Sequence, residues 1–239
     1  MSIDVTDLTV RFGGVVSLNK MTLTFPDGTC GLIGPNGAGK TTFFNVLSGY
    51  VTPASGSVVV DGTELLGMPD FQRARWGVRR TFQTEQAIED LTVFENVLTV
   101  EEHTGSSSRA ERTAAVDAAL EFTNLTPVRD ELVRTLGSRE RRFIEVARAV
   151  VGRPRLVLLD EPAAGLPEHE TIELGSIIQA IPERTGATVV LVDHDMSLVQ
   201  ACCEWSAVLD FGMLLASGPT REVLEDEKVL AAYVGEELV

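Results

Sequence analysis

The chain has 239 residues, of which 44% are hydrophobic, so its length fits one large α/β domain, with or without a smaller inserted subdomain. Its 35 acidic and 20 basic residues give a formal net charge of −15, which argues against wrapping nucleic acid, because neutralising phosphates requires a basic face. No apolar run approaches the roughly 18 residues that cross a bilayer, so we expect a cytoplasmic chain.

The first quarter of the chain predicts β structure. Residues 3–25 alternate between apolar and polar side chains, with a break at Arg11-Phe-Gly-Gly14. The start of the chain, at residues 1–7, is acidic and alternating, which suits a first strand and not a positively charged signal peptide. Residues 58–62, Val-Val-Val-Asp-Gly, predict a further strand and turn. We therefore expect an antiparallel β layer that precedes and flanks the segment between residues 25 and 58.

That segment carries a phosphate-binding loop. Residues 34–42 match the pattern G-x-x-x-x-G-K-[ST] in full, after an apolar run at 30–33 that predicts a buried strand. Glycines permit the tight turn that aims backbone N–H groups at one anion, and the next helix directs its positive end at the phosphates. Lys40 is expected to contact the outer phosphates, and the Thr41 hydroxyl to hold Mg²⁺. A chance glycine-rich turn is the alternative. The expected nucleotide-binding residues here are Asn36, Gly37, Ala38, Gly39, Lys40, Thr41 and Thr42.

Composition changes between about residues 84 and 150, where a helical insertion is predicted. Residues 101–108, Glu-Glu-His-Thr-Gly-Ser-Ser-Ser, predict a flexible loop. Residues 110–125 then show helical spacing. The positions that carry this spacing are Val116, Ala119, Leu120 and Thr123.

Two apolar runs in the last third predict parallel strands. Residues 156–160 and 188–193 are strand-sized and a helical stretch separates them, which is typical of a parallel sheet with crossover helices. The first run ends in Asp160-Glu161, where a P-loop enzyme places its Mg²⁺-holding aspartate. Glu161 is then free to accept a proton from the attacking water. An acidic strand end also occurs by chance, but Lys40 in the same chain favours the functional reading.

Two further polar residues are candidates for the same site. Gln83 follows Arg80-Thr-Phe and could contact Mg²⁺ and sense the γ-phosphate; a lone glutamine is otherwise a surface residue. His194 ends the second predicted strand and could hydrogen-bond the γ-phosphate, whereas a lone histidine at a strand end is more often structural.

The cysteines show no metal-ligand spacing. Cys30, Cys202 and Cys203 are an odd number, which in an intracellular enzyme indicates reduced thiols with a packing role. Lysine is rare, occurring only at positions 20, 40 and 228.

The motifs together resemble those of ABC-type ATPases, and the resemblance covers essentially the whole chain. It implies a P-loop NTPase fold of class α/β, with a mostly parallel core sheet, an antiparallel β subdomain and an inserted α-helical subdomain. The implied single domain, 1–239, has a nucleotide-binding core with a β layer at about 1–83 and 151–239, and a helical signature subdomain at about 84–150. The implied activity is ATP hydrolysis coupled to transport. In chain order the matching segments are the phosphate loop, Thr81-Phe-Gln83, residues 136–150, Leu158-Leu-Asp-Glu-Pro162 and Val192-Asp-His-Asp-Met196.

Four shorter segments are similar to the ATP-binding subunits of branched-chain amino acid importers. This likeness implies that Phe12 stacks on adenine, although a phenylalanine is also often a core residue. It implies that residues 84–97 receive a coupling helix of a permease subunit. Permease subunits would hold the chain on the inner face of the cell membrane, with a second ABC ATPase or a second copy as dimer partner and, indirectly, a substrate-binding protein. The segments are Arg11–Gly14, Thr92–Val97, Glu161–Leu166 and Ala231–Glu236.

The chain departs from this family at its signature segment, which acts on the nucleotide of the dimer partner. Where the family carries Leu-Ser-Gly-Gly-Gln, this chain has Leu136-Gly137-Ser138-Arg139-Glu140. Gly137 has no hydroxyl, Arg139 replaces a glycine that allows close approach, and Glu140 turns a carboxylate toward phosphate. Pro167 also stands where the family usually has Asp or Asn. We expect an asymmetric heterodimer in which only one ATP turns over at full rate, unless Arg139 itself reaches the phosphate.

Three other functions stay open on the sequence alone. An ABC ATPase that serves no transporter, as in iron–sulfur cluster assembly or translation, is one. A transporter ATPase for lipid extraction is another, and a nucleotide-binding regulatory subunit without turnover is the third.

Overall fold

The computed structural model describes residues 2–104 and 108–234, and its centre is a six-stranded sheet. The strand order is β10-β9-β3-β8-β7-β6, and all neighbours are parallel except the β10–β9 pair. The mostly parallel sheet predicted for the core is therefore confirmed. The bounds are β3 Thr29–Ile33, β6 Val78–Arg80, β7 Leu156–Asp160, β8 Thr188–Val192, β9 Trp205–Asp210 and β10 Met213–Pro219.

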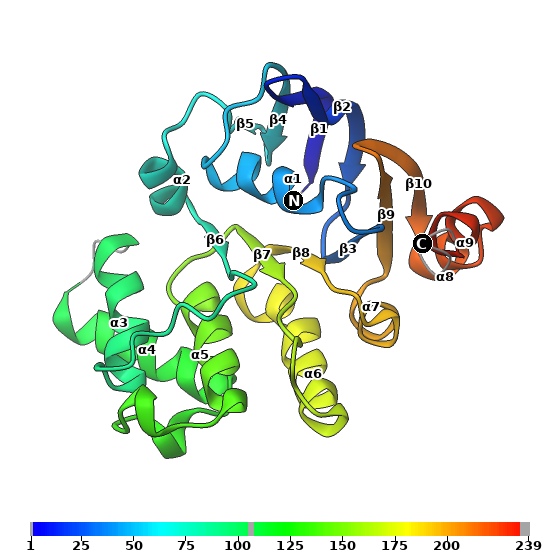
Figure 1. Cartoon of the computed structure of the whole chain (residues 1–239). Helices are drawn as coiled ribbons and strands as arrows, with labels where there is room; N and C mark the ends of the chain where they lie inside the picture. The colour runs from blue at the N-terminus through cyan, green and yellow to red at the C-terminus, as the bar shows by residue number, and fades with distance from the viewer. Residues whose placement is uncertain (1, 105–107, 235–239) are drawn as a thin grey trace.

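A second, antiparallel sheet forms the predicted β layer. Its order is β2-β1-β4-β5, with helix α1 between it and the six-stranded sheet (Figure 1). The break predicted at Arg11–Gly14 is shorter in the structure: Arg11 and Phe12 still belong to β1, and only Gly13 and Gly14 form the turn between the first two strands. The bounds are β1 Ile3–Phe12, β2 Val15–Phe25, β4 Ser55–Val60 and β5 Thr63–Glu64.

The strands β3, β7 and β8 of the six-stranded sheet are buried on both faces, and β7 shows why such a strand has an apolar sequence. Leu156 and Leu158 pack in the core shared with the antiparallel sheet and α1. Val157 and Leu159 pack in the opposite core, which the remaining helices cover. Neighbouring residues of a strand point to opposite faces, so a strand between two layers needs apolar residues at every position.

The helices lie mostly below the central sheet in Figure 1, with α3, α4 and α5 gathered at one end and α6 and α7 beside them. Helix α6 joins β7 to β8, as predicted for a crossover. The bounds are α1 Lys40–Ser48, α2 Asp70–Trp76, α3 Val93–Thr104, α4 Arg109–Phe122, α5 Ser138–Val150, α6 Glu168–Thr185, α7 Met196–Cys202, α8 Thr220–Leu224 and α9 Glu227–Val234, with short 3₁₀ turns at Thr126–Val128 and Val133–Thr135.

The helix predicted at 110–125 is confirmed over residues 110–122 as α4, which ends at Phe122 with Thr123 as its C-cap. The four positions that carried the periodicity are all buried. Ser108 caps it, accepting from the N–H of Glu111 while the Glu111 carboxylate accepts from the N–H of Ser108. The loop predicted at 101–108 is wrong for its first four residues, which are the last turn of α3. Residues 105–107 of that prediction, Met1, and the end of the segment at 231–236 lie outside the described residues.

The predicted packing role of the cysteines is confirmed. Cys30, Cys202 and Cys203 are buried free thiols. Burial raises the pKa of Cys30 and of Cys202 to about 12, so both stay protonated at neutral pH. Within residues 2–104 and 108–234, no helix is long and apolar enough to cross a membrane.

Candidate nucleotide site

The phosphate loop joins β3 to α1, and two of its glycines are required by close packing. A Cβ on Gly34 would lie 2.1 Å from the carbonyl oxygen of Leu209, and one on Gly39 would lie 2.8 Å from that of Ser17. Both glycines also have positive φ, of 145° and 106°. The sequence pattern therefore matches what the backbone needs.

Lys40 begins α1 and its side chain lies within the loop. The residue is only 6% exposed, and its Nζ donates to the carbonyl oxygens of Gly34 and Pro35, the latter at 2.9 Å. Asn36, Gly37 and Thr41 are exposed to solvent, whereas Ala38 and Gly39 are buried.

The end of α1's first turn is attached to the antiparallel sheet. The Thr42 and Ser17 hydroxyls are 2.7 Å apart, and the N–H of Gly212 donates to the carbonyl of Ala38 at 3.0 Å. These contacts hold the loop against β2 and the β9–β10 turn.

Asp160 is the last residue of β7 and its side chain is only 5% exposed. Its Oδ2 accepts from Arg80 Nη2 at 2.9 Å, and its N–H donates to the Thr81 hydroxyl at 3.0 Å. Arg80, on β6, also donates to Asn45 Oδ1 of α1 at 2.6 Å. Burial raises the pKa of Asp160 above its ordinary value, while Arg80 opposes that rise. Arg80 thus connects the Asp160 carboxylate to the helix that begins with Lys40.

Glu161 turns out of the sheet with a φ of 49°, a conformation that costs a non-glycine residue about 1–2 kcal/mol. Its N–H donates to the carbonyl of Val192 at 2.7 Å, which stabilises this turn. The Oε2 atom accepts from Gln83 Nε2 at 3.0 Å, and Oε1 is 3.1 Å from His194 Nε2. The three residues proposed for catalysis therefore meet, although they are far apart in the sequence.

The four polar segments share one edge of the sheet. The strands β3, β8, β7 and β6 are successive parallel neighbours, so their carboxyl ends lie at the same edge. These ends lead into the phosphate loop, His194, Asp160 and Gln83 respectively. Ligands of open α/β sheets bind at this edge. Thr41, Gln83 and Asp160 offer hydroxyl, amide and carboxylate oxygens, the donor types that Mg²⁺ prefers, so these residues fit the ion.

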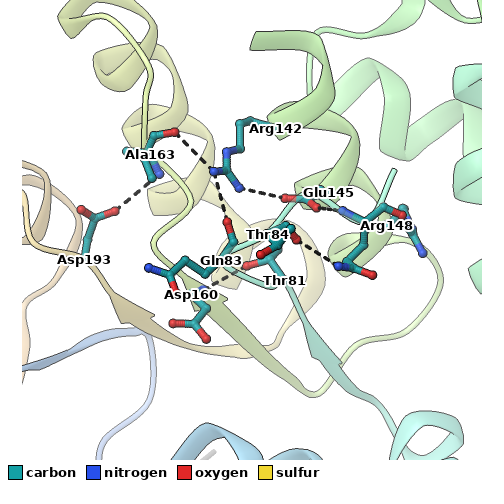
Figure 2. A network of polar contacts seen from close by, with 11 residues as sticks. Thr81, Gln83, Thr84, Arg142, Glu145, Arg148, Asp160, Ala163 and Asp193 are labelled. Atoms are coloured by element: carbon teal, nitrogen blue, oxygen red, sulfur yellow. Dashed lines mark hydrogen bonds and ion pairs between the residues drawn. The ribbon is translucent and has the colours of Figure 1, made fainter. Parts of the chain in front are cut away.

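A polar network behind the site was not predicted and is shown in Figure 2. Asp193 is buried, and its Oδ2 accepts from the N–H of Ala163 at 3.4 Å while Oδ1 accepts from the N–H of Asp195 at 3.0 Å. Burial raises the pKa of Asp193 above its ordinary value. On the other side Arg142, of α5, donates to the carbonyls of Gln83 and Ala164 at 3.3 and 3.4 Å.

The signature segment precedes and begins α5, with Gly137 as an N-cap that has no side chain. Arg139 does not extend freely from it. Its Nη2 and Nε contact the two carboxylate oxygens of Glu173, on α6, at 2.5 and 3.1 Å, and its guanidinium lies 4.4 Å from the ring centre of Phe143. The hydrogen bond with Glu173 raises the pKa of Arg139, and that with Arg139 lowers the pKa of Glu173.

Glu140 adds a carboxylate to the same helix start. Its Oε1 lies 3.2 Å from Arg139 Nη1, and a Cβ on Gly137 would lie 3.2 Å from its Oε2. Ser138 is exposed at the first position of the helix. Pro167 stands as the N-cap of α6 without a side-chain hydrogen bond, so the departure seen there in the sequence removes a polar group from this surface.

A groove of about 400 Å³ lies between α2, β6, α3 and α5. Tyr50 and Phe71 are exposed aromatic residues along it, and Phe82 lies 6.0 Å from the Tyr50 ring. Gln86 is the residue of the predicted docking segment 84–97 that lines this groove, together with the buried Glu145. Phe12 is 51% exposed at the end of β1, and its stacking on adenine stays a prediction.

Comparison with known proteins identifies the family. Residues 18–164 match the ABC transporter family. The chain is 37% identical to BraF of Pseudomonas aeruginosa, a high-affinity branched-chain amino acid transport ATP-binding protein, over 98% of each chain. The chain belongs to the ABC transporter family. It is an ATPase of that family, and the predicted resemblance to importer ATPases is confirmed.

The chain is also similar to other ABC proteins, in sequence and in structure. LptB of Haemophilus influenzae, a lipopolysaccharide export system ATP-binding protein, is 35% identical over 87% of this chain and 86% of its own. The crystal structure of the ADP conformation of MJ1267, an ATP-binding cassette of an ABC transporter, superposes with a TM-score of 0.86 at 24% identity, covering 98% and 99% of the two chains. This likeness confirms the predicted fold class.

The contacts missed by sequence reasoning join residues that are distant in the chain. Arg80 stands three positions before Gln83, and Asp193 directly precedes His194, so both lie near predicted site residues. The pairing of Arg80 with Asp160, and of Asp193 with the N–H of Ala163, joins residues that are 80 and 30 positions apart and had no local signal.

Proposed function

We propose that this chain is the ATP-hydrolysing subunit of an ABC importer for branched-chain or related amino acids, or for amides such as urea. The observation that carries the proposal is Glu161, held between Gln83 and His194 at the sheet edge that bears the phosphate loop. The likeness to BraF over nearly the whole of both chains supports the amino acid cargo.

The geometry supports a separate role in hydrolysis for each group of site residues. The loop N–H groups and Lys40 would bind the phosphates, and Asp160, Thr41 and Gln83 would hold Mg²⁺, which would supply positive charge to the phosphates. Glu161 accepts the proton of the attacking water. His194 contacts the γ-phosphate and, through its present 3.1 Å contact, also orients the Glu161 carboxylate.

We further propose an asymmetric heterodimer. The signature segment would face the γ-phosphate bound by the partner, but Arg139 is held by Glu173 and Glu140 adds negative charge at the start of α5. A phosphate that approached this helix start would meet the Glu140 carboxylate and would find no hydroxyl at position 137, because the exposed Ser138 lies one residue further along the chain. The ATP bound at Lys40 would be hydrolysed against an intact partner signature, and the partner's ATP would turn over slowly.

Permease subunits are the proposed partners at the groove. Its exposed aromatic residues, Tyr50 and Phe71, offer apolar area of the kind that interfaces bury. A coupling helix docked there would place the chain at the inner face of the membrane, and a substrate-binding protein would act on the same permease from the other side.

The test is ATP hydrolysis after co-expression with the ATPase encoded beside it. Glu161→Gln is compared with the equivalent change in the partner. Loss of hydrolysis from the change in this chain alone supports the asymmetric pair. Equal effects would show a functionally symmetric pair, and unchanged activity with Glu161→Gln would remove Glu161 as the base.

Export of a lipid is a second candidate, favoured by the 35% identity to LptB. Reconstitution with the permeases of the same gene cluster separates the two. Stimulation of hydrolysis by a loaded amino acid-binding protein supports the importer, and stimulation by lipid supports the exporter.

A further inference from the structure

Arg142 is a buried guanidinium on α5, just beyond the signature segment. Its side chain is 9% exposed, and its contacts go to three separate parts of the chain (Figure 2). Nη2 donates to the carbonyl of Gln83 at 3.3 Å and to that of Ala164 at 3.4 Å, and Nη1 donates to Glu145 Oε2 at 3.3 Å. One planar group therefore binds two loops that are about 80 residues apart.

Both carbonyl acceptors belong to segments that contact Glu161. The Gln83 side chain donates to Glu161 Oε2 at 3.0 Å. The N–H of Ala164 donates to the backbone carbonyl of Glu161 at 3.2 Å, which closes the turn that carries this residue. Arg142 touches neither the Glu161 side chain nor the phosphate loop in the contacts described, so it can act on the carboxylate only through these two segments.

Glu145 connects the same guanidinium to the groove. Its Oε1 accepts from the N–H of Gln86 at 2.6 Å, and Arg148 donates to the carbonyl of Gln86, also at 2.6 Å. Gln86, Glu145 and Arg148 all line the groove. Glu145 is 5% exposed, and burial raises its pKa above the ordinary value. Burying this carboxylate is energetically unfavourable, and its pair with Arg142 offsets part of that free energy.

We propose that Arg142 is a positioning residue for hydrolysis: it fixes the positions of Gln83 and of the 161–166 turn on either side of Glu161. Its pair with Glu145 connects these two segments to residues that line the groove. The inference rests on the proposed role of Glu161 as the base. A guanidinium suits this role because its planar N–H donors, fixed in direction, reach two carbonyls and a carboxylate at once. The donors of a lysine ammonium rotate and do not fix these directions.

The experiment uses the full chain with its partner ATPase and compares Arg142→Gln, Arg142→Lys and Arg109→Gln. Arg109 is the control, since it is an exposed arginine at the start of α4, outside the signature segment and the docking segment. We expect Arg142→Gln to lower kcat roughly 10- to 100-fold, Arg142→Lys to recover part of it, and the affinity for a fluorescent ATP analogue to change less than twofold. Arg109→Gln leaves kcat within about twofold.

Amide hydrogen exchange supplies a readout that does not depend on turnover. Faster exchange confined to residues 83–87 and 161–166 is the expected result for Arg142→Gln. Faster exchange along the whole of α5, with kcat and ATP affinity falling in parallel, would show a structural role only and overturn the proposal. If Arg142→Gln does not fold, Arg142→Lys and Glu145→Gln are combined, and additive effects on kcat would count against a shared network.

The test of Arg142 as a positioning residue can be distinguished from the test of Glu161 as the base. Loss of hydrolysis in Glu161→Gln with normal kcat in Arg142→Gln would keep the base and reject the positioning role. Unchanged hydrolysis in Glu161→Gln would reject the base, and the positioning role would fall with it.

Discussion

Two helix starts in this molecule share a glycine N-cap and have opposite electrostatics. Helices α1 and α5 each follow a glycine that provides no side-chain cap, left-handed at Gly39 and extended at Gly137, and the first-turn N–H groups of each helix have no partner within the helix. The first turn of α1, all of it described, carries no acidic residue, and Lys40 stands at its first position. The first turn of α5 carries Glu140, and Arg139 beside it is paired with Glu173.

The difference teaches that a helix start becomes an anion site only where the chain leaves it open to the anion. The partial positive charge of a helix N-terminus attracts phosphate or a carboxylate of the chain itself alike. At α5 the chain supplies its own carboxylate, and at α1 it supplies a lysine. In the proposed asymmetric pair, the start of α1 would bind this chain's own ATP, and the start of α5 would slow turnover of the partner's ATP.

The largest expected effect is at the catalytic end. Glu161→Gln should lower turnover roughly 10²- to 10⁴-fold with ATP affinity nearly unchanged, because the amide cannot accept the proton of water. Steady-state hydrolysis and binding of a fluorescent ATP analogue measure the two quantities. Glu168→Gln, an exposed position at the start of α6, is the control. Turnover within tenfold of the wild type would contradict the assignment.

Arg80→Leu should reduce the free energy of unfolding by about 3–5 kcal/mol, because it leaves the buried Asp160 carboxylate unpaired. Urea denaturation measures it, with Arg75→Leu on the exposed face of α2 as the control. A loss below about 1 kcal/mol would mean that water or another group replaces Arg80.

Restoring the signature should raise hydrolysis at the partner's nucleotide roughly tenfold. The double change Arg139→Gly with Glu140→Gln removes the arginine and the carboxylate from the start of α5. It is measured with Glu161→Gln in the same chain, so that the partner's ATP is the one hydrolysed. Arg134→Gln, which breaks a surface pair with Asp90, is the control. No increase would show that these two residues do not slow the partner site.

The smallest effect concerns the pair that holds Arg139. Glu173→Gln should lower the free energy of unfolding by up to about 1 kcal/mol at pH 7. Because Arg139 lowers the pKa of Glu173 in the folded state, the contribution of the pair is complete above the ordinary value of 4.5 and disappears as the pH falls through the lower folded value. Denaturation at pH 7, 5 and 4 follows it against Glu121→Gln, and a difference independent of pH would contradict it.

Local patterns were sufficient for most of the site. The phosphate loop, the acidic end of β7 and the histidine after β8 each lie within a few residues of a strand end, and parallel strands bring such ends together. The sequence therefore predicted which residues would meet, including Gln83, Glu161 and His194.

Contacts between distant segments were beyond those patterns. Arg80 pairs with Asp160 and Arg139 with Glu173 only after the sheet and the helices have assembled, and an arginine on a strand or helix is usually solvated. The loop expected at 101–104 fails for a similar reason. Glu101 is a polar residue but only 5% exposed, so its polarity does not mark a solvent-exposed loop. It continues the buried face of α3 that begins with Val93 and Val97, and the helix runs on to Thr104.

The position of Lys40 also gives the protein a built-in chemical probe. The chain has three lysines, of which Lys20 and Lys228 are exposed, whereas Lys40 is buried against two loop carbonyls. An amine-directed acylating reagent should therefore modify the first two rapidly and the third slowly. The extent of labelling at that one peptide, read by mass spectrometry, would report the opening of the phosphate loop and its protection by nucleotide without any engineered label.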